Sequence, residues 1–140
     1  LRNLLGGLGG KWKGTDEEQL DLAGAILSKD HRTAARVASG PFQNVLESLA
    51  RRLGIKPNQK ADESKLGALA RQLDGDSRLL PLGLQRGDLT VDRSNGLWHL
   101  RNRAVHDDPD ITPIQADRLI GETKRLRKLL DGPFRAKPWW

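Results

Sequence analysis

The residues that could carry chemistry in this chain lie close together, between Leu97 and Asp107. On a helix that turns 100° per residue, the apolar side chains of this segment form one arc, and Arg101 falls at about 40°, near its middle. A guanidinium keeps its charge, so an arginine in an apolar arc needs a carboxylate, a phosphate or a polar interface. An ion pair within the chain, or a buried stem whose head reaches water, would satisfy Arg101 without a function.

Two further polar residues lie on the adjacent face of the same predicted helix. Asn102 at about 140° and His106 at about 180° are one turn apart, beside Trp98, whereas His99 and Arg103 point further round, toward solvent. A histidine near a helix end is also explained as a partner of the helix dipole.

Arg101 and His106 lie about 140° apart on this helix. One straight helix therefore cannot direct both side chains at one phosphate. A distorted helix end before Pro109, or pairing with a second copy of the chain, would bring them together.

The pattern Arg101-Asn102-x-x-x-His106 resembles the signature of the HEPN superfamily (higher eukaryotes and prokaryotes nucleotide-binding), an Arg, a polar residue and a His four to six residues later. The setting Leu97-x-x-Leu-Arg-Asn-x-Ala-Val-His is similar to that of the family. Residues 111–120 resemble the helix that closes the bundle in several bacterial HEPN families, some of phage-defence type. Helix order extends the resemblance over roughly residues 30–130, and motifs carry it over about residues 94–121.

This resemblance implies a metal-independent endoribonuclease of a toxin or antiviral-defence system, which cuts RNA by transesterification at facing motifs of a homodimer. It implies that Arg101 holds the scissile phosphate, that His106 acts as acid or base on the ribose 2′-OH and the leaving oxygen, and that Asn102 orients one of them. No cofactor or metal is implied. Two alternatives stay open: a non-catalytic HEPN-like module that binds RNA, nucleotide or protein within a larger protein, and a plain helical interaction domain.

The chain departs from the family at one position. HEPN toxins paired with nucleotidyltransferase-type antitoxins have Tyr two residues after the His, where this chain has Asp108, and the chain contains no Tyr. Neutralisation by modification of that Tyr is therefore not carried over. Asp107 and Asp108 also place negative charge beside the site, which either favours a protonated His106 or repels RNA.

The elements that would position this segment are all helical. Thr15 and Glu18 form a predicted capping box that starts a first helix. A second helical stretch begins near Asp30 and must kink or break at residues 39–41, because Pro41 lacks an N–H group and collides with the preceding turn. An apolar stripe then runs over residues 42–53 until Gly54 ends it.

Three more helices are predicted, over about residues 62–73, 94–107 and 112–131. The last begins at Thr112-Pro113-Ile114-Gln115, which offers an N-cap, Pro at the first position and Gln at the third, and ends at residues 132–133. No alternating strand pattern occurs. We therefore expect an all-α, up-and-down bundle of four to five helices, HEPN-like and kinked near Pro41.

Charge points to an acidic partner. The chain has 140 residues, 24 Lys and Arg against 18 Asp and Glu, and a net charge of +6, which suits RNA or serves solubility alone. The candidate RNA-binding residues are Arg103 and the basic residues of the last helix, although these also fit an ordinary solvated face. The latter are Lys124, Arg125, Arg127 and Lys128.

The composition sets further limits. Cysteine is absent, which excludes disulfides, zinc fingers and thiol catalysis and is compatible with the cytoplasm. Methionine is absent too, so we expect a piece of a longer polypeptide, fused or bound to a regulatory domain or antitoxin. Residues 1–14 are interpreted as a flexible lead-in or linker remnant, 15–132 as the helical domain and 133–140 as a basic aromatic tail. No membrane span is predicted.

Overall fold

The described residues contain five α-helices, within the four to five that the sequence predicts. The structure, a computed structural model, describes residues 14–84, 87–90 and 96–131. These residues form α-helices and one short 3₁₀ helix at Leu80–Leu82, with no strand in the described ranges, so the all-α prediction is confirmed. The helices are α2 (Asp16–Ile26), α3 (His31–Arg52), α4 (Lys65–Leu73), α5 (Leu97–Val105) and α6 (Pro113–Asp131).

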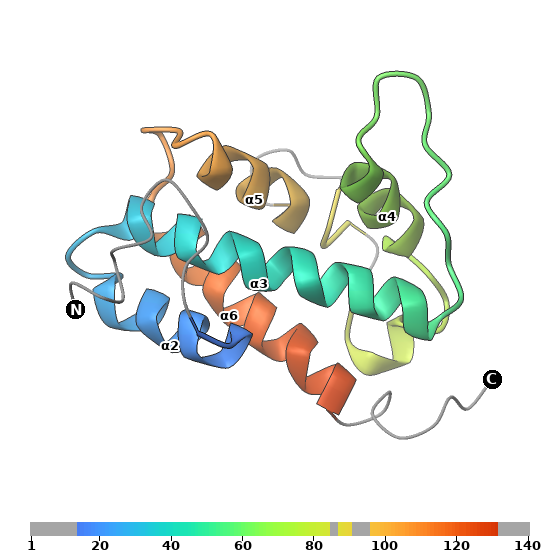
Figure 1. Cartoon of the computed structure of the whole chain (residues 1–140), viewed down its shortest axis with the longest axis horizontal. Coiled ribbons are helices and arrows are strands. Elements are labelled where there is room, and N and C mark those ends of the chain that lie inside the picture. The colour runs from blue at the N-terminus through green and yellow to red at the C-terminus, as the bar shows by residue number, and fades with distance from the viewer. Residues whose placement is uncertain (1–13, 85–86, 91–95, 132–140) are drawn as a thin grey trace.

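Helix α3 crosses the middle of the molecule, with α2 and α6 along one side and α4 and α5 along the other (Figure 1). The predicted apolar stripe faces this centre: Phe42, Leu46 and Leu49 are fully buried. Leucines from every other helix close around them. Burial of one such side chain stabilises the fold by roughly 1.5–3 kcal/mol, so α3 is the support on which the other helices are placed.

The helix ends follow the predicted signals. Thr15 and Glu18 form the reciprocal capping box of α2, and Asp30 caps α3. At the other end of α3, Gly54 has φ +70° and donates its N–H to Arg51, while Ile55 donates to Ala50. A positive φ costs glycine no Cβ clash, so Gly54 ends the helix as expected.

The expected break at Pro41 does not occur, because α3 continues as one helix through this residue. Gly40 precedes the proline, and without a Cβ it relieves the clash that a proline imposes on its predecessor. Pro41 and Phe42 are both buried. Packing on both sides of α3 therefore offsets the loss of one backbone hydrogen bond.

Two predicted boundaries shift. The helix expected over 62–73 begins at Lys65, with Ser64 as its N-cap, because Asp62 adopts a left-handed conformation (φ +63°) that a helix start cannot use. The helix expected over 94–107 is described from Leu97 to Val105. The expected lead-in up to residue 13, the start at residues 94–95, the helix end at 132–133 and the tail at 133–140 lie outside the described residues.

Helix α6 starts as predicted, since Thr112 and Gln115 bond reciprocally, backbone N–H to side-chain oxygen, at 3.0 and 3.1 Å. Within the part of the chain that is described, no helix is long and apolar enough to cross a membrane.

Candidate functional site

Helix α5, which carries the candidate residues, is positioned from its N-terminal end by α4. Asp74, the C-cap of α4, accepts hydrogen bonds from the backbone of residues 87 and 89. Residues 88 and 89 in turn accept the first two helical N–H groups of α5, those of Leu97 and Trp98, at 2.9 and 3.0 Å. The start of α5 is therefore satisfied by backbone rather than by a side-chain cap.

Helix α5, the N-terminal end of α4 and the loop before it enclose a groove of about 790 Å³, which we call the α4–α5 groove. Its floor includes Gln43 of α3. The lining residues are Gln43, Asp62, Glu63, Ser64, Lys65, Leu66, Gly67, Arg71, Thr90, Trp98, His99, Arg101 and Asn102. Two of the three candidate catalytic residues, Arg101 and Asn102, thus line one concave site.

Arg101 is half-buried in this groove and has no carboxylate partner among the described residues. Its Nη2 donates to Oε1 of Gln43 at 2.9 Å, and its guanidinium lies 5.5 Å from the ring centroid of Trp98. Its Nε is buried without an acceptor. Burial lowers the pKa of Arg101, and no carboxylate of the described residues pairs with it to compensate its charge.

The other charged side chains of the groove are an ion pair, the cation Lys65 and the exposed carboxylate of Asp62. Arg71 donates from Nε and Nη2 to both carboxylate oxygens of Glu63 at 2.9 Å. Hydrogen bonds from the Arg71 side chain and the Lys60 backbone lower the pKa of Glu63 to about 2. Lys65 is exposed and forms no ion pair in the described residues. Arg101 and Lys65 are therefore the two cations of the groove with no carboxylate partner.

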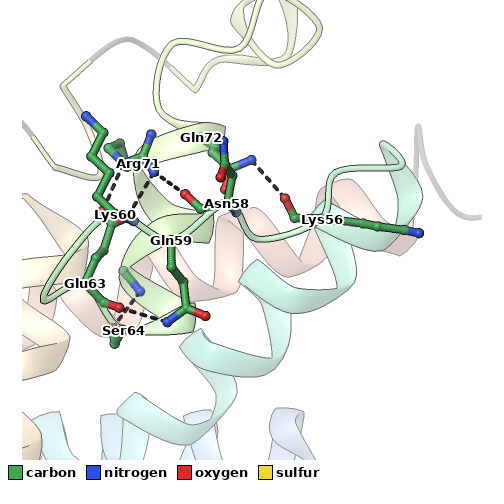
Figure 2. A network of polar contacts seen from close by, with 9 residues as sticks. Lys56, Asn58, Gln59, Lys60, Glu63, Ser64, Arg71 and Gln72 are labelled. Carbon is green, nitrogen blue, oxygen red and sulfur yellow. Dashed lines mark hydrogen bonds and ion pairs between the residues drawn. The ribbon is translucent and has the colours of Figure 1, made fainter.

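The loop that forms the outer wall of the groove is fixed to α4 by side chains (Figure 2). Arg71 also donates to the carbonyl of Asn58 at 2.7 Å. Gln72 accepts the N–H of Asn58 and donates to the carbonyl of Lys56. The irregular segment between α3 and α4 is thus held by polar contacts from one face of α4, which gives the groove a defined wall.

Close packing between α4 and α5 shapes the inner end of the groove. A Cβ placed at Gly67 would lie 3.0 Å from Oγ of Ser64 and 3.3 Å from Cζ2 of Trp98. A residue with a Cβ at this position would require Ser64 or Trp98 to move by a few tenths of an ångström. Gly67 therefore sets the separation of the two helices at the groove.

His99 and Asn102 complete the polar lining. The prediction that His99 points toward solvent is wrong: His99 is half-buried, and its Nε2 lies 2.8 Å from the carbonyl of Thr90. A carbonyl only accepts, so Nε2 carries the proton and Nδ1 is left as an acceptor in the neutral ring. Asn102 is half-buried beside it. The groove thus offers neutral donors and acceptors next to Arg101.

His106 lies outside the groove, exposed at the C-terminal end of α5. The helix ends here because Asp107 is left-handed (φ +54°) and donates its N–H to Ala104, while Asp108 donates to Arg103. This turn precedes Pro109, so the helix stops two residues earlier than predicted. A single chain brings Arg101 and Asn102 together and leaves His106 on the outer surface.

The two aspartates after His106 are both paired. Asp107 forms an ion pair with Arg32 of α3 at 3.1 Å, and Arg32 also donates to the Asp107 carbonyl at 3.0 Å. Asp108 pairs with Arg103 at 2.8 Å. Their charges are thus partly balanced by arginines beside His106. Arg103, a predicted RNA-binding residue, is partly buried as the partner of Asp108 in this ion pair.

The basic residues of α6 also have carboxylate neighbours. Arg125 pairs with Glu122 at 2.6 Å, and Arg127 pairs with Asp16 of α2 at 3.2 Å. Lys124 lies 3.6 Å from a carboxylate of α2, and Lys128 is exposed next to these residues. The predicted RNA-binding face of α6 therefore carries alternating charge, whereas Arg101 in the groove is half-buried with no carboxylate partner among the described residues.

Several groove residues escaped the sequence analysis, above all Gln43 and Lys65. Gln43 sits 58 positions before Arg101, so no local spacing links the two. Gly67, an isolated glycine within a helical pattern, was the available signal for a close approach. No cluster of three or more metal-binding side chains occurs in the described ranges.

Comparison with protein-family models, with curated proteins and with solved structures gave no match to this chain.

Proposed function

We propose that this chain is a metal-independent endoribonuclease domain of a toxin or antiviral-defence type system, in which Arg101, Asn102 and His106 act on RNA. The observation that carries the proposal is the half-buried Arg101 in a groove, with no carboxylate partner among the described residues. A guanidinium in this setting gains most from an external anion, and a phosphodiester is the anion that the Arg-Asn-x-x-x-His motif implies. His106 is exposed and so remains accessible to a substrate.

The active site then requires two copies of the chain. His106 follows Arg101 by five positions, which corresponds to about 7.5 Å along the helix axis and about 140° around it. In the proposed dimer, Arg101 of one copy and His106 of the other meet at one scissile phosphate. The surface near His106 suits such a contact, because the neighbouring Val105 is 44% exposed.

The reaction needs no group beyond these side chains and the RNA. His106 takes the proton of the ribose 2′-OH, whose oxygen attacks the adjacent phosphorus. The imidazole of His106 then returns this proton to the leaving 5′ oxygen. Arg101 stabilises the charge that develops on the phosphate oxygens, and Asn102 orients the nucleotide that carries this phosphate. The products are a 2′,3′-cyclic phosphate and a 5′-hydroxyl end.

A second candidate is a non-catalytic module that binds RNA or a nucleotide. It is favoured by one observation: the groove that contains Arg101 and Asn102 does not contain His106. In this alternative the groove is the functional site, and His106, exposed at the end of α5, takes no part in binding.

The test is cleavage of single-stranded RNA in EDTA by the wild type, His106→Ala and Arg101→Ala, with Lys29→Ala as an exposed control. We expect the wild type and Lys29→Ala to cut and both site variants to lose at least about a hundredfold in rate. Cleavage that survives His106→Ala overturns the catalytic assignment. Absence of cleavage by the wild type favours the binding module.

Mixing the two inactive variants tests the shared site. If Arg101 and His106 act from different copies, half of the dimers in an equal mixture are mixed, and each contains one intact site. We expect recovery of about one quarter of the wild-type rate. No recovery despite mixed dimers, or a strictly monomeric wild type by solution mass measurement, contradicts the shared site.

A further inference from the structure

The α4–α5 groove is larger than a phosphate group requires. Its volume of about 790 Å³ falls within the range of pockets that enclose small organic ligands, roughly 300–1,000 Å³. Its lining also contains two side-chain amides, of Gln43 and Asn102, which an inorganic anion would not need. The groove is therefore suited to a ligand that joins an anion to a hydrogen-bonding organic group.

The charged side chains of the groove determine where the anionic group of such a ligand binds. Arg71 is neutralised by Glu63. Of the remaining charged side chains of the described lining, Arg101 and Lys65 are cations without a carboxylate partner, and Asp62 is an exposed carboxylate that pairs with neither. The guanidinium of Arg101 is held against Trp98 and uses Nη2 on Gln43. Its orientation is thus set before a ligand arrives, which reduces the entropy that binding costs.

The side-chain amides of Gln43 and Asn102 offer hydrogen bonds to the organic group of the ligand. Oε1 of Gln43 accepts from Arg101, so its NH₂ group remains as a donor. Asn102 offers both a donor and an acceptor, and Nδ1 of His99 adds an acceptor because Nε2 is used on Thr90. A nucleobase presents an edge of alternating donors and acceptors that side chains of this kind recognise in single-stranded RNA.

We propose that the α4–α5 groove is a subsite for one nucleotide, with the phosphate on Arg101 and Lys65 and the base on the amides of Gln43 and Asn102. The inference deepens the proposed function and rests on it in so far as the ligand is RNA. The same nucleoside phosphate chemistry occurs in a unit of a single-stranded RNA and in a free mononucleotide. His106 is outside the subsite, so nucleotide binding and cleavage can be measured separately.

Binding is measured by calorimetry on the full chain at fixed low salt, with uridine and adenosine monophosphate, inorganic phosphate and a single-stranded pentaribonucleotide. We expect at least one nucleoside monophosphate or the pentanucleotide to bind roughly tenfold or more tightly than inorganic phosphate. Binding of the mononucleotide identifies a free nucleotide as a sufficient ligand. Binding of the pentanucleotide alone identifies a strand. Equal affinity for phosphate and all three nucleotide probes overturns the subsite.

Gln43→Glu is the sharpest variant because it nearly preserves shape. It places a carboxylate 2.9 Å from Nη2 of Arg101, at the position of the present amide oxygen, and so gives Arg101 a permanent counter-ion. We expect the melting temperature to stay equal or rise while nucleotide affinity falls about tenfold or more. Unchanged affinity in this folded variant overturns the proposal.

A matched pair of charge reversals separates the groove from general attraction. Lys65→Glu changes the lining, whereas Lys56→Glu reverses an equally exposed lysine that does not line the groove. We expect Lys65→Glu to weaken nucleotide binding about tenfold and Lys56→Glu to change it by less than about twofold. Equal losses in the two variants overturn the subsite.

The same variants distinguish the two proposals. A wild type that binds nucleotide in the groove but cuts no RNA contradicts the ribonuclease and leaves the subsite intact. A wild type that cuts RNA while Gln43→Glu and Lys65→Glu retain its KM contradicts the subsite and leaves the ribonuclease intact.

Discussion

Replacement of Arg101 by methionine tests whether this arginine serves the fold or a ligand. Methionine keeps an apolar stem of similar length, so packing against the helices is largely retained. The variant loses the hydrogen bond to Gln43 and the contact with Trp98. These are worth about 1.5–3 kcal/mol for a charged donor and about 0.5–1 kcal/mol for a cation–π contact at a partly exposed site.

The variant also removes two costs. The half-buried guanidinium is desolvated without a carboxylate partner in the described residues, and its buried Nε has no acceptor. An unsatisfied buried donor costs about 1–3 kcal/mol. Partial desolvation of the charge adds a further cost, which solvent screening of the exposed part of the side chain reduces. The two sides nearly cancel, so we expect the free energy of unfolding to change by less than about 1 kcal/mol.

The assay is urea unfolding of the wild type and Arg101→Met, with Leu100→Ala as a destabilised reference. Leu100 is 1% exposed on the same helix, and its truncation should cost about 2–5 kcal/mol. A loss above about 3 kcal/mol in Arg101→Met, the size expected when a buried charge pair is broken, would refute the reasoning. Arg101 would then be a structural residue rather than a ligand-binding one.

Two further predictions concern the walls of the groove. Gly67→Ala gains about 1 kcal/mol of helix propensity. Its new Cβ would lie 3.3 Å from Trp98, and this overpacking costs about 1–3 kcal/mol. Urea unfolding should therefore show that the free energy of unfolding falls by up to about 2 kcal/mol. Gly121→Ala, with no atom within 4 Å, should instead gain about 0.5–1 kcal/mol, and a gain in both variants would contradict the close approach. The Arg71–Glu63 pair lowers the pKa of Glu63 from 4.5 to about 2, so its stabilisation is complete above pH 4.5 and is lost as the pH falls toward 2. Amide exchange of residues 58–60 should follow this window, and Glu63→Gln should abolish the change; loss of protection already at pH 5 would argue against it.

Local signals in the sequence were sufficient for most of the fold. The capping pairs at Thr15 and Thr112 and the stop at Gly54 act within four residues, so local chemistry determines them. The apolar stripe of α3 predicted the buried face that the structure confirms. Of the kink or break predicted at Pro41, the break was wrong because the cost of a proline is local, whereas the packing that offsets it comes from α2, α5 and α6 on either side of α3.

For the candidate site, too, some features follow from the sequence and others depend on the tertiary structure. The residue types at 101, 102 and 106 and their angles on a helix follow from the sequence and the 100° turn. The sequence also showed that Arg101 is anomalous in an apolar arc, but not what meets it there. An ion pair within the chain was the plainest resolution, and only the tertiary structure excludes it for the described residues.

Sequence alone therefore determined an all-α chain, its helix starts and a polar motif on one helix, because these depend on neighbours a few residues apart. Only the tertiary structure decided that Gln43 reaches Arg101, that Gly67 brings α4 against Trp98, and that His106 is left outside the groove. These contacts join segments tens of residues apart. Their geometry depends on how α3, α4 and α5 pack, which no local pattern specifies.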